Sequence, residues 1–180
     1  MKNFLTSLTL AAMTLALVPQ AVLAEEGVPI KASFAVAFSG TPNTGSVVYC
    51  GGTAGPIAIE AHGDGYSTLG PLAFSLQKTQ AGALFHGCLT LTAPNGDTLT
   101  ATYDAAGSAP PNANHFSPAT GSLTFTGGTG RFSGASGSAH FTAVFDAFYP
   151  LSSFVGGVPA PLQGMAFYLV EGNVSLRDND

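Results

Sequence analysis

Histidines are the side chains of this sequence that could bind a ligand or a metal ion. None stands in an HxH or HExxH motif or at zinc spacing from a cysteine, so the sequence predicts neither a metal site nor a cofactor. Three histidines lie on the polar side of alternating segments and, with Glu60, would share one surface if those segments were neighbouring strands. These candidate ligand-binding residues are His62, His86 and His140. The simpler interpretation, which stays open, is that they face water.

Two carboxylates are the candidates for general acid–base catalysis. Glu60 and Asp146 fall inside predicted strands, where a charged residue is disfavoured unless it has a function or faces solvent. Asp64 and Asp97 stand beside glycines and are better read as turn formers. The serines lack a G-x-S-x-G motif, so hydrolase chemistry has no signature here.

Cys50 and Cys88 are the chain's two cysteines. We predict a disulfide between them because the protein is expected to be exported, and a loop of this length would stabilise the fold by about 4 kcal/mol. Two unpaired thiols are the alternative. A nucleophilic cysteine is disfavoured because neither residue has a base nearby in the sequence.

The first 24 residues are typical of a signal peptide. Lys2 precedes an apolar run, Pro19 ends it, and Val22-Leu23-Ala24 provides a cleavage site. The run is too short for a membrane anchor, which needs about 20 apolar residues. We therefore expect a secreted or periplasmic protein, not membrane-spanning after cleavage, with one domain over residues 25–180.

The charge content excludes several classes of protein. Only 8% of the residues are charged, and five Lys and Arg stand against ten Asp and Glu, so a nucleic-acid-binding surface is not expected. A coiled coil needs many more charged residues at helical spacing. A disordered chain would not carry 13 phenylalanines.

Apolar and polar residues alternate with a period of two in several segments of the chain, and this pattern predicts about eight strands. Their approximate ranges are Ile30–Ser39, Ile57–His62, Leu72–Gln77, Phe85–Thr92, Thr98–Asp104, Ser122–Thr126, His140–Phe148 and Met165–Leu176. Asn95-Gly96 suggests a type I′ hairpin turn. Proline and glycine predict loops at Ala105–Pro118 and Pro150–Gly164.

Antiparallel strands must hide their edges, and closure does so completely. We therefore predict an all-β fold, a single closed eight-stranded antiparallel β-barrel, with a β-sandwich as the alternative. An outer-membrane barrel is less favoured because the face opposite the phenylalanines carries Ser, Thr, His and Asp rather than a continuous apolar band.

A glycine-rich segment adds a family resemblance. Residues 124–137, TFTGGTGRFSGASG, resemble the allene oxide cyclase and dirigent β-barrel superfamily, and Gly63–Gly70 and Asn95–Leu99 are similar to its uncharacterised exported bacterial members. The resemblance implies an eight-stranded barrel with a central cavity, often in a homo-oligomer. It implies no catalytic residue, because the match covers a structural turn at Gly127, Gly128 and Gly130. Ser136 stands where plant dirigent proteins carry a basic residue.

Three functions are compatible with these features. The first is non-catalytic binding of a small apolar ligand or a surface partner. The second is a cyclase or isomerase acting on an apolar substrate in the barrel cavity, and the third an adhesive or envelope-structural module. A cavity with buried carboxylates would favour the enzyme, whereas a barrel packed solid with phenylalanine would argue against a ligand in its interior.

Overall fold

The computed structural model describes residues 27–44, 47–107, 116–148, 154–155, 158–159 and 162–176. The predicted signal peptide lies outside these ranges, as does His115, the fourth histidine of the sequence. The elements are β1 (Val28–Pro42), β2 (Ile57–Ser67), β3 (Gly70–Ala81), β4 (Leu84–Thr92), β5 (Thr98–Gly107), β6 (Phe116–Gly128), the 3₁₀ helix η1 (Gly130–Phe132), β7 (Ser136–Phe148), β8 (Phe154–Val155), β9 (Val158–Pro159) and β10 (Leu162–Ser175). Among the described residues, no helix is long and apolar enough to cross a membrane.

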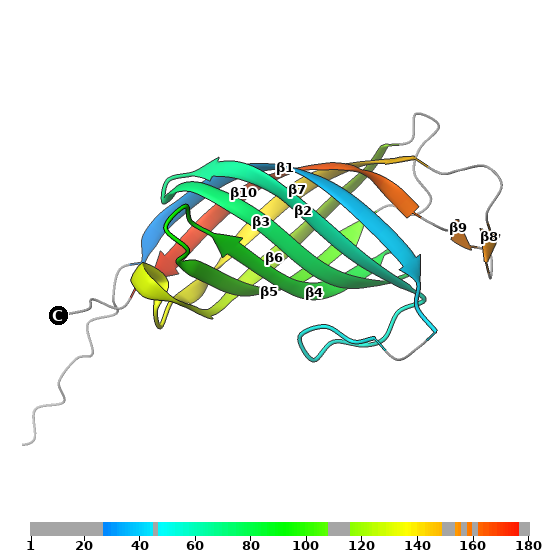
Figure 1. Cartoon of the computed structure of the whole chain (residues 1–180), viewed down its shortest axis with the longest axis horizontal. Coiled ribbons are helices and arrows are strands. Elements are labelled where there is room, and N and C mark those ends of the chain that lie inside the picture. The colour runs from blue at the N-terminus through cyan, green and yellow to red at the C-terminus, as the bar shows by residue number, and fades with distance from the viewer. Residues whose placement is uncertain are drawn as a thin grey trace, which may run out of the picture.

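Eight of the strands form one closed barrel, in the order β1-β10-β7-β6-β5-β4-β3-β2 (Figure 1). Each strand pairs antiparallel with its neighbours, and β1 closes the sheet by pairing with both β2 and β10. The prediction of a closed eight-stranded barrel is therefore confirmed, and the sandwich alternative is wrong. Closure leaves the eight-stranded sheet without an unpaired edge, which matters in a chain with few charges to protect one.

Several boundaries differ from the predicted ones. Strands β5 and β6 extend into the predicted loop at Ala105–Pro118, because small residues there continue the ladder, as in the pair Gly107 and Ala119. The predicted loop at Pro150–Gly164 contains the short β8–β9 pair and the start of β10. At the β4–β5 turn only Gly96 has a positive φ, of 90°, so the turn is not type I′.

The core lies inside the barrel, where alternate residues of each strand project. Eight aromatic rings meet there with centroid separations of 4.8 to 6.4 Å, namely those of Phe34, Phe38, Phe74, Phe85, Tyr103, Phe141, Phe145 and Tyr168. Small inward residues make room for them. At Gly121, for example, a Cβ atom would stand 2.5 Å from the Phe141 ring. The interior is therefore filled largely by its own side chains.

Candidate functional site

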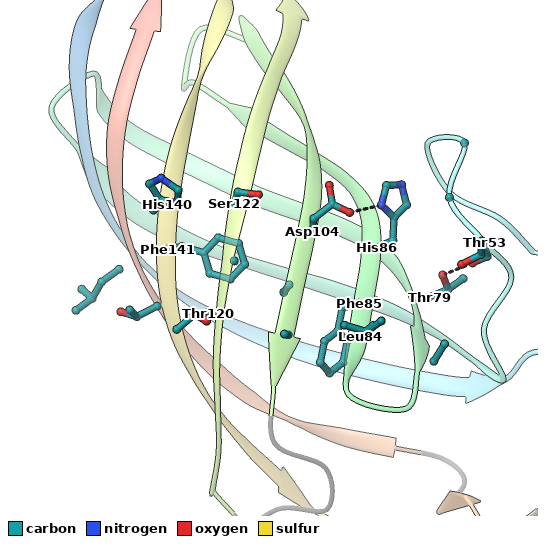
Figure 2. Close-up of a pocket in the computed structure, with 18 of the residues that line it drawn as sticks. Thr53, Thr79, Leu84, Phe85, His86, Asp104, Thr120, Ser122, His140 and Phe141 are labelled. Atoms are coloured by element: carbon teal, nitrogen blue, oxygen red, sulfur yellow. Dashed lines mark hydrogen bonds and ion pairs between the residues drawn. The ribbon is translucent and has the colours of Figure 1, made fainter.

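An open groove of about 1110 Å³ lies on the outer wall of the barrel, from the end of β3 across β4, β5, β6, β7 and β10 (Figure 2). Residues 51–53, from the β1–β2 connection, border it at one end. Apolar side chains supply part of the lining, including Leu84, Phe85 and Leu169. Polar side chains supply the rest, so the groove offers both kinds of contact to a ligand.

The polar side chains of the groove form a row across five strands. His86 pairs with Asp104, Asp104 with Ser122, and Ser122 with His140 in the strand register. Glu171 of β10 is the register partner of His140. Because register partners on one face stand side by side, the barrel assembles these residues from distant parts of the sequence. Figure 2 shows the first four side by side on neighbouring strands.

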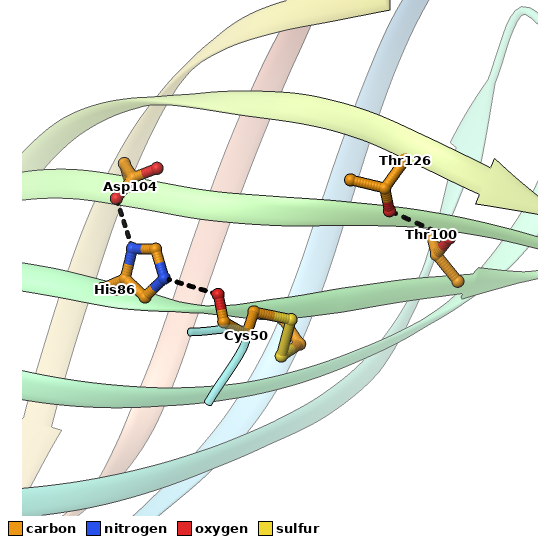
Figure 3. Close-up of a disulfide and its surroundings, with 6 residues drawn as sticks. Cys50, His86, Thr100, Asp104 and Thr126 are labelled. Carbon is orange, nitrogen blue, oxygen red and sulfur yellow. Dashed lines mark hydrogen bonds and ion pairs between the residues drawn. A yellow bond between two sulfur atoms is a disulfide. The ribbon is translucent and has the colours of Figure 1, made fainter. Parts of the chain in front are cut away.

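His86 and Asp104 form the ion pair of this row. Nδ1 of His86 lies 2.5 Å from a carboxylate oxygen of Asp104, and Nε2 lies 3.4 Å from the carbonyl oxygen of Cys50 (Figure 3). The hydrogen bond to Asp104 raises the pKa of His86, and partial burial opposes this rise. Both ring nitrogens face acceptors, an arrangement that the protonated imidazolium satisfies fully.

The predicted disulfide between Cys50 and Cys88 is confirmed, with the two Cα atoms 5.5 Å apart. It ties the β1–β2 connection to the outer face of β4 (Figure 3). A second link is the hydroxyl of Thr79, which donates to the carbonyl oxygen of Thr53 at 2.9 Å. This cover explains why Thr79 is buried on the outer face, and it fixes the border of the groove.

The other predicted site residues do not join the groove. Glu60 and His62 are exposed on the outer face of β2, where Glu60 accepts a hydrogen bond from Gln77 at 3.2 Å. Asp146 is half-buried on the outer face of β7. Strands β1 and β10 separate β2 from β7, so the two candidate carboxylates are not neighbours. Of the three candidate histidines, the groove brings together His86 and His140 alone.

The glycine-rich segment forms the connection between β6 and β7. Gly127 and Gly130 have positive φ angles of 141° and 55°, a region that favours glycine. Gly128 serves a different purpose, because a Cβ atom there would stand 2.1 Å from the carbonyl oxygen of Thr98. The turn is followed by the short helix η1, which contains Arg131, before β7 begins at Ser136.

The barrel interior contains a residue that the sequence analysis missed. Lys78 of β3 is 1% exposed, and its Nζ atom has no hydrogen-bond partner. The rings of Phe145, Phe85 and Tyr103 surround this nitrogen, with centroids 4.4, 4.6 and 5.1 Å away. In the described ranges, Lys78 is the one residue with a charged side chain that is buried.

Burial dominates the protonation of Lys78. Removal from water lowers its pKa from 10.5 to about 7, although the surrounding ring faces favour a cation. Two further polar atoms share the aromatic cluster, the hydroxyls of Tyr103 and Tyr168, and neither makes a hydrogen bond of good geometry. Burial also raises the pKa of both phenols. The interior thus holds one amine without a hydrogen-bond partner and two phenols whose hydroxyls interact with each other.

The sequence did contain a signal for Lys78. The inward positions of β3 are Leu72, Phe74 and Leu76, and the same alternation places Lys78 next on the inner face. Opposite it, Gly87 of β4 has no side chain, and a Cβ atom there would stand 2.6 Å from that of Lys78. Extending the alternation by one step would therefore have predicted a lysine inside the barrel.

The carboxylates, histidines and cysteines of the described ranges include no group of three or more arranged to hold a metal ion.

Comparisons with known proteins add one similarity. No family model matches the sequence, and no curated protein matches it. Among solved structures, the chain is similar to the pterocarpan synthase dirigent protein GePTS1, with 17% sequence identity and a TM-score of 0.39. The match covers 84% of this chain and 88% of that one. The family resemblance of the glycine-rich segment stays a prediction.

Proposed function

We propose that this protein is a non-catalytic, exported binding protein that takes up a small amphipathic molecule in its outer groove. The observation that carries the proposal is the groove itself, whose volume of about 1110 Å³ is large enough for a small molecule, since such sites measure roughly 300–1000 Å³. The disulfide supports export, because such bonds persist in oxidising compartments.

The lining suggests how such a molecule would bind. Its apolar part would lie against Leu84 and Leu169, which are exposed in the unliganded wall. Its polar groups would meet Ser122, His140 and the carboxylate of Asp104. An acid–base role for Glu60 and Asp146 is less favoured, because these two carboxylates lie outside the groove.

A fluorescence titration with N-phenyl-1-naphthylamine tests the proposal, since this uncharged probe combines an apolar body with an N–H group that can donate to the oxygens of Asp104 and Ser122. We expect saturable binding that Leu84→Ser weakens three- to tenfold, because the variant loses about 1 kcal/mol of apolar contact. The matched control is Val28→Ser, an exposed apolar position of β1 outside the groove. Amide shifts of the labelled protein would locate the probe. Equal binding by both variants, or shifts away from the groove, would contradict the proposal.

A second candidate is self-association through an apolar stripe on β10. The stripe consists of Met165, Phe167 and Leu169, with Val144 beside it on β7, all exposed on the outer wall. Exposed apolar patches of this kind often mark interfaces. Light scattering of the wild type and of Phe167→Glu tests this candidate. A monomeric wild type at 100 μM or so would rule it out.

A further inference from the structure

We propose that Lys78 is a covalent capture site for a small hydrophobic aldehyde or ketone, held inside the barrel as an imine. The proposal concerns the interior rather than the outer groove, and so it stands or falls independently of the proposed function. It depends on the surroundings of the amine, its protonation and its route to solvent.

The surroundings of Lys78 give its amine no hydrogen-bond or ion-pair partner. No carboxylate in the described ranges is buried, so none pairs with the nitrogen. The packed elements present Phe85 from β4, Tyr103 from β5 and Phe145 from β7, and the tyrosine is the titratable group among them. An unpaired buried amine is costly and calls for an explanation beyond packing. The apolar rings would instead hold the body of a hydrophobic carbonyl compound.

The protonation of the amine suits nucleophilic attack. With a pKa of about 7, about half of the Lys78 side chains are uncharged at neutral pH. An ordinary exposed lysine, with a pKa near 10.4, is uncharged about one time in 2500 under the same conditions. Burial in an apolar site is a recognised way to activate a lysine toward carbonyl groups.

The reaction balances without an external oxidant or reductant. The Nζ lone pair attacks the carbonyl carbon, giving a carbinolamine as the nitrogen loses a proton and the oxygen gains one. The carbinolamine then loses water, so that C=N replaces C=O and both protons of the neutral amine leave with the oxygen. The hydroxyls of Tyr103 and Tyr168, which lie in the same aromatic cluster, are the proton donors available to that oxygen.

The route to Lys78 passes Phe85. This ring is only partly buried, lines the outer groove and also lies 4.6 Å from the Lys78 nitrogen. It stacks on Phe145 with a centroid separation of 6.0 Å. Rotation of this one side chain would therefore connect the interior amine with the groove. Because the rings fill the interior, a captured ligand would have to take the place that the Phe85 ring leaves when it turns toward the groove.

Reductive trapping followed by peptide mass mapping tests the proposal. The folded protein is incubated at pH 7 with benzaldehyde and cyanoborohydride, and the benzyl adducts on Lys78 and on the exposed Lys31 are compared. We expect Lys78 to react at least tenfold faster, even though burial slows access to it. Replacing Lys31 by arginine should leave the adduct at Lys78 unchanged, and Lys78→Met should abolish that adduct alone.

Two control reactions, one with a smaller aldehyde and one with unfolded protein, distinguish the possible outcomes. Formaldehyde, the smallest aldehyde, reports whether any carbonyl compound reaches the nitrogen, and protein unfolded in urea shows that the Lys78 peptide is detected once modified. Reaction of folded Lys78 with formaldehyde but not with benzaldehyde would overturn the hydrophobic specificity. Reaction at Lys31 alone, with Lys78 modified only in urea, would overturn the capture site altogether. The wild-type comparison remains informative even if the Lys78→Met variant fails to fold.

Discussion

Replacement of the buried Lys78 by methionine should stabilise the protein, and the gain should depend on pH. Methionine has a similar length and no charge, so it can fill the same space. The unfolded chain keeps the lysine proton up to about pH 10.4, whereas the folded protein releases it near pH 7. Between these values the unfolded state binds more protons, so the free energy of unfolding of the wild type rises with pH.

The magnitude follows from the depressed pKa. Each tenfold change in proton affinity is worth about 1.4 kcal/mol, so the lysine costs about 4 kcal/mol at pH 7.5 and about 1.5 kcal/mol at pH 9.5. The advantage of Lys78→Met should therefore shrink by about 2.5 kcal/mol over this interval. The phenols of Tyr103 and Tyr168, whose pKa values burial raises, do not affect this difference, because they contribute equally to the wild type and the variant.

Urea denaturation followed by circular dichroism at pH 7.5 and 9.5 measures both quantities. The matched control is Lys31→Met, since Lys31 is exposed and forms a surface ion pair with Glu171 at 3.4 Å. This control should change the free energy of unfolding by no more than about 1 kcal/mol at either pH. A Lys78→Met variant less stable than the wild type, or an equal difference at both pH values, would refute the reasoning.

Three further variants test the groove and the interior. The double variant Cys50→Ser, Cys88→Ser should lower the free energy of unfolding by about 4 kcal/mol, measured by chemical denaturation. It should also weaken binding of the fluorescent probe, because the disulfide fixes one border of the groove. Unchanged probe binding would contradict that role of the disulfide. Asp104→Asn should lower the pKa of His86, read from its ring proton shifts, because it removes the largest cause of the upward shift. In the wild type the His86–Asp104 pair stabilises the fold below about pH 6.5, and this stabilisation is lost as the pH rises through the raised pKa of His86. An Asp104→Asn variant as stable as the wild type at pH 5.5 would contradict this contribution. Gly87→Ala should lower the free energy of unfolding by about 1 to 3 kcal/mol, because the added methyl group would stand 2.1 Å from a carbonyl oxygen of β3. The loss would be measured as a lower melting temperature. An unaltered melting temperature would show that the backbone of β3 and β4 can move apart to accept the methyl group.

The fold was predictable because its signals are local and repeated. Inward positions such as Val36, Leu76 and Tyr103 alternate with polar ones, and closure is the simplest way to pair every edge. The ends of strands were less predictable. Alanine and glycine near Gly107 carry little strand preference of their own, and the ladder partner Ala119 decides their conformation.

The candidate site was only partly predictable, because it depends on strand order and register. His86 and His140 share the groove since β5 and β6 stand between their strands with matching register, which no local pattern reveals. Lys78 is a different case. Its inward position follows from the alternation of β3, but its lack of a partner depends on rings from three other strands. When a strand is predicted from alternation, the pattern should therefore be continued to the end of the strand, so that a polar residue at an inward position is recognised.

Titration of the lysine side chains tests most directly whether the Lys78 amine inside the barrel is largely uncharged at neutral pH. Protein labelled with ¹³C at lysine Cε would be followed by NMR from pH 5 to 11, with the Lys78 signal assigned by its absence from Lys78→Met. A buried, unpaired amine predicts that this signal titrates near pH 7, well below that of an exposed lysine. A Lys78 signal that titrates above about pH 10 would show a charged, solvated or paired ammonium and would contradict the account.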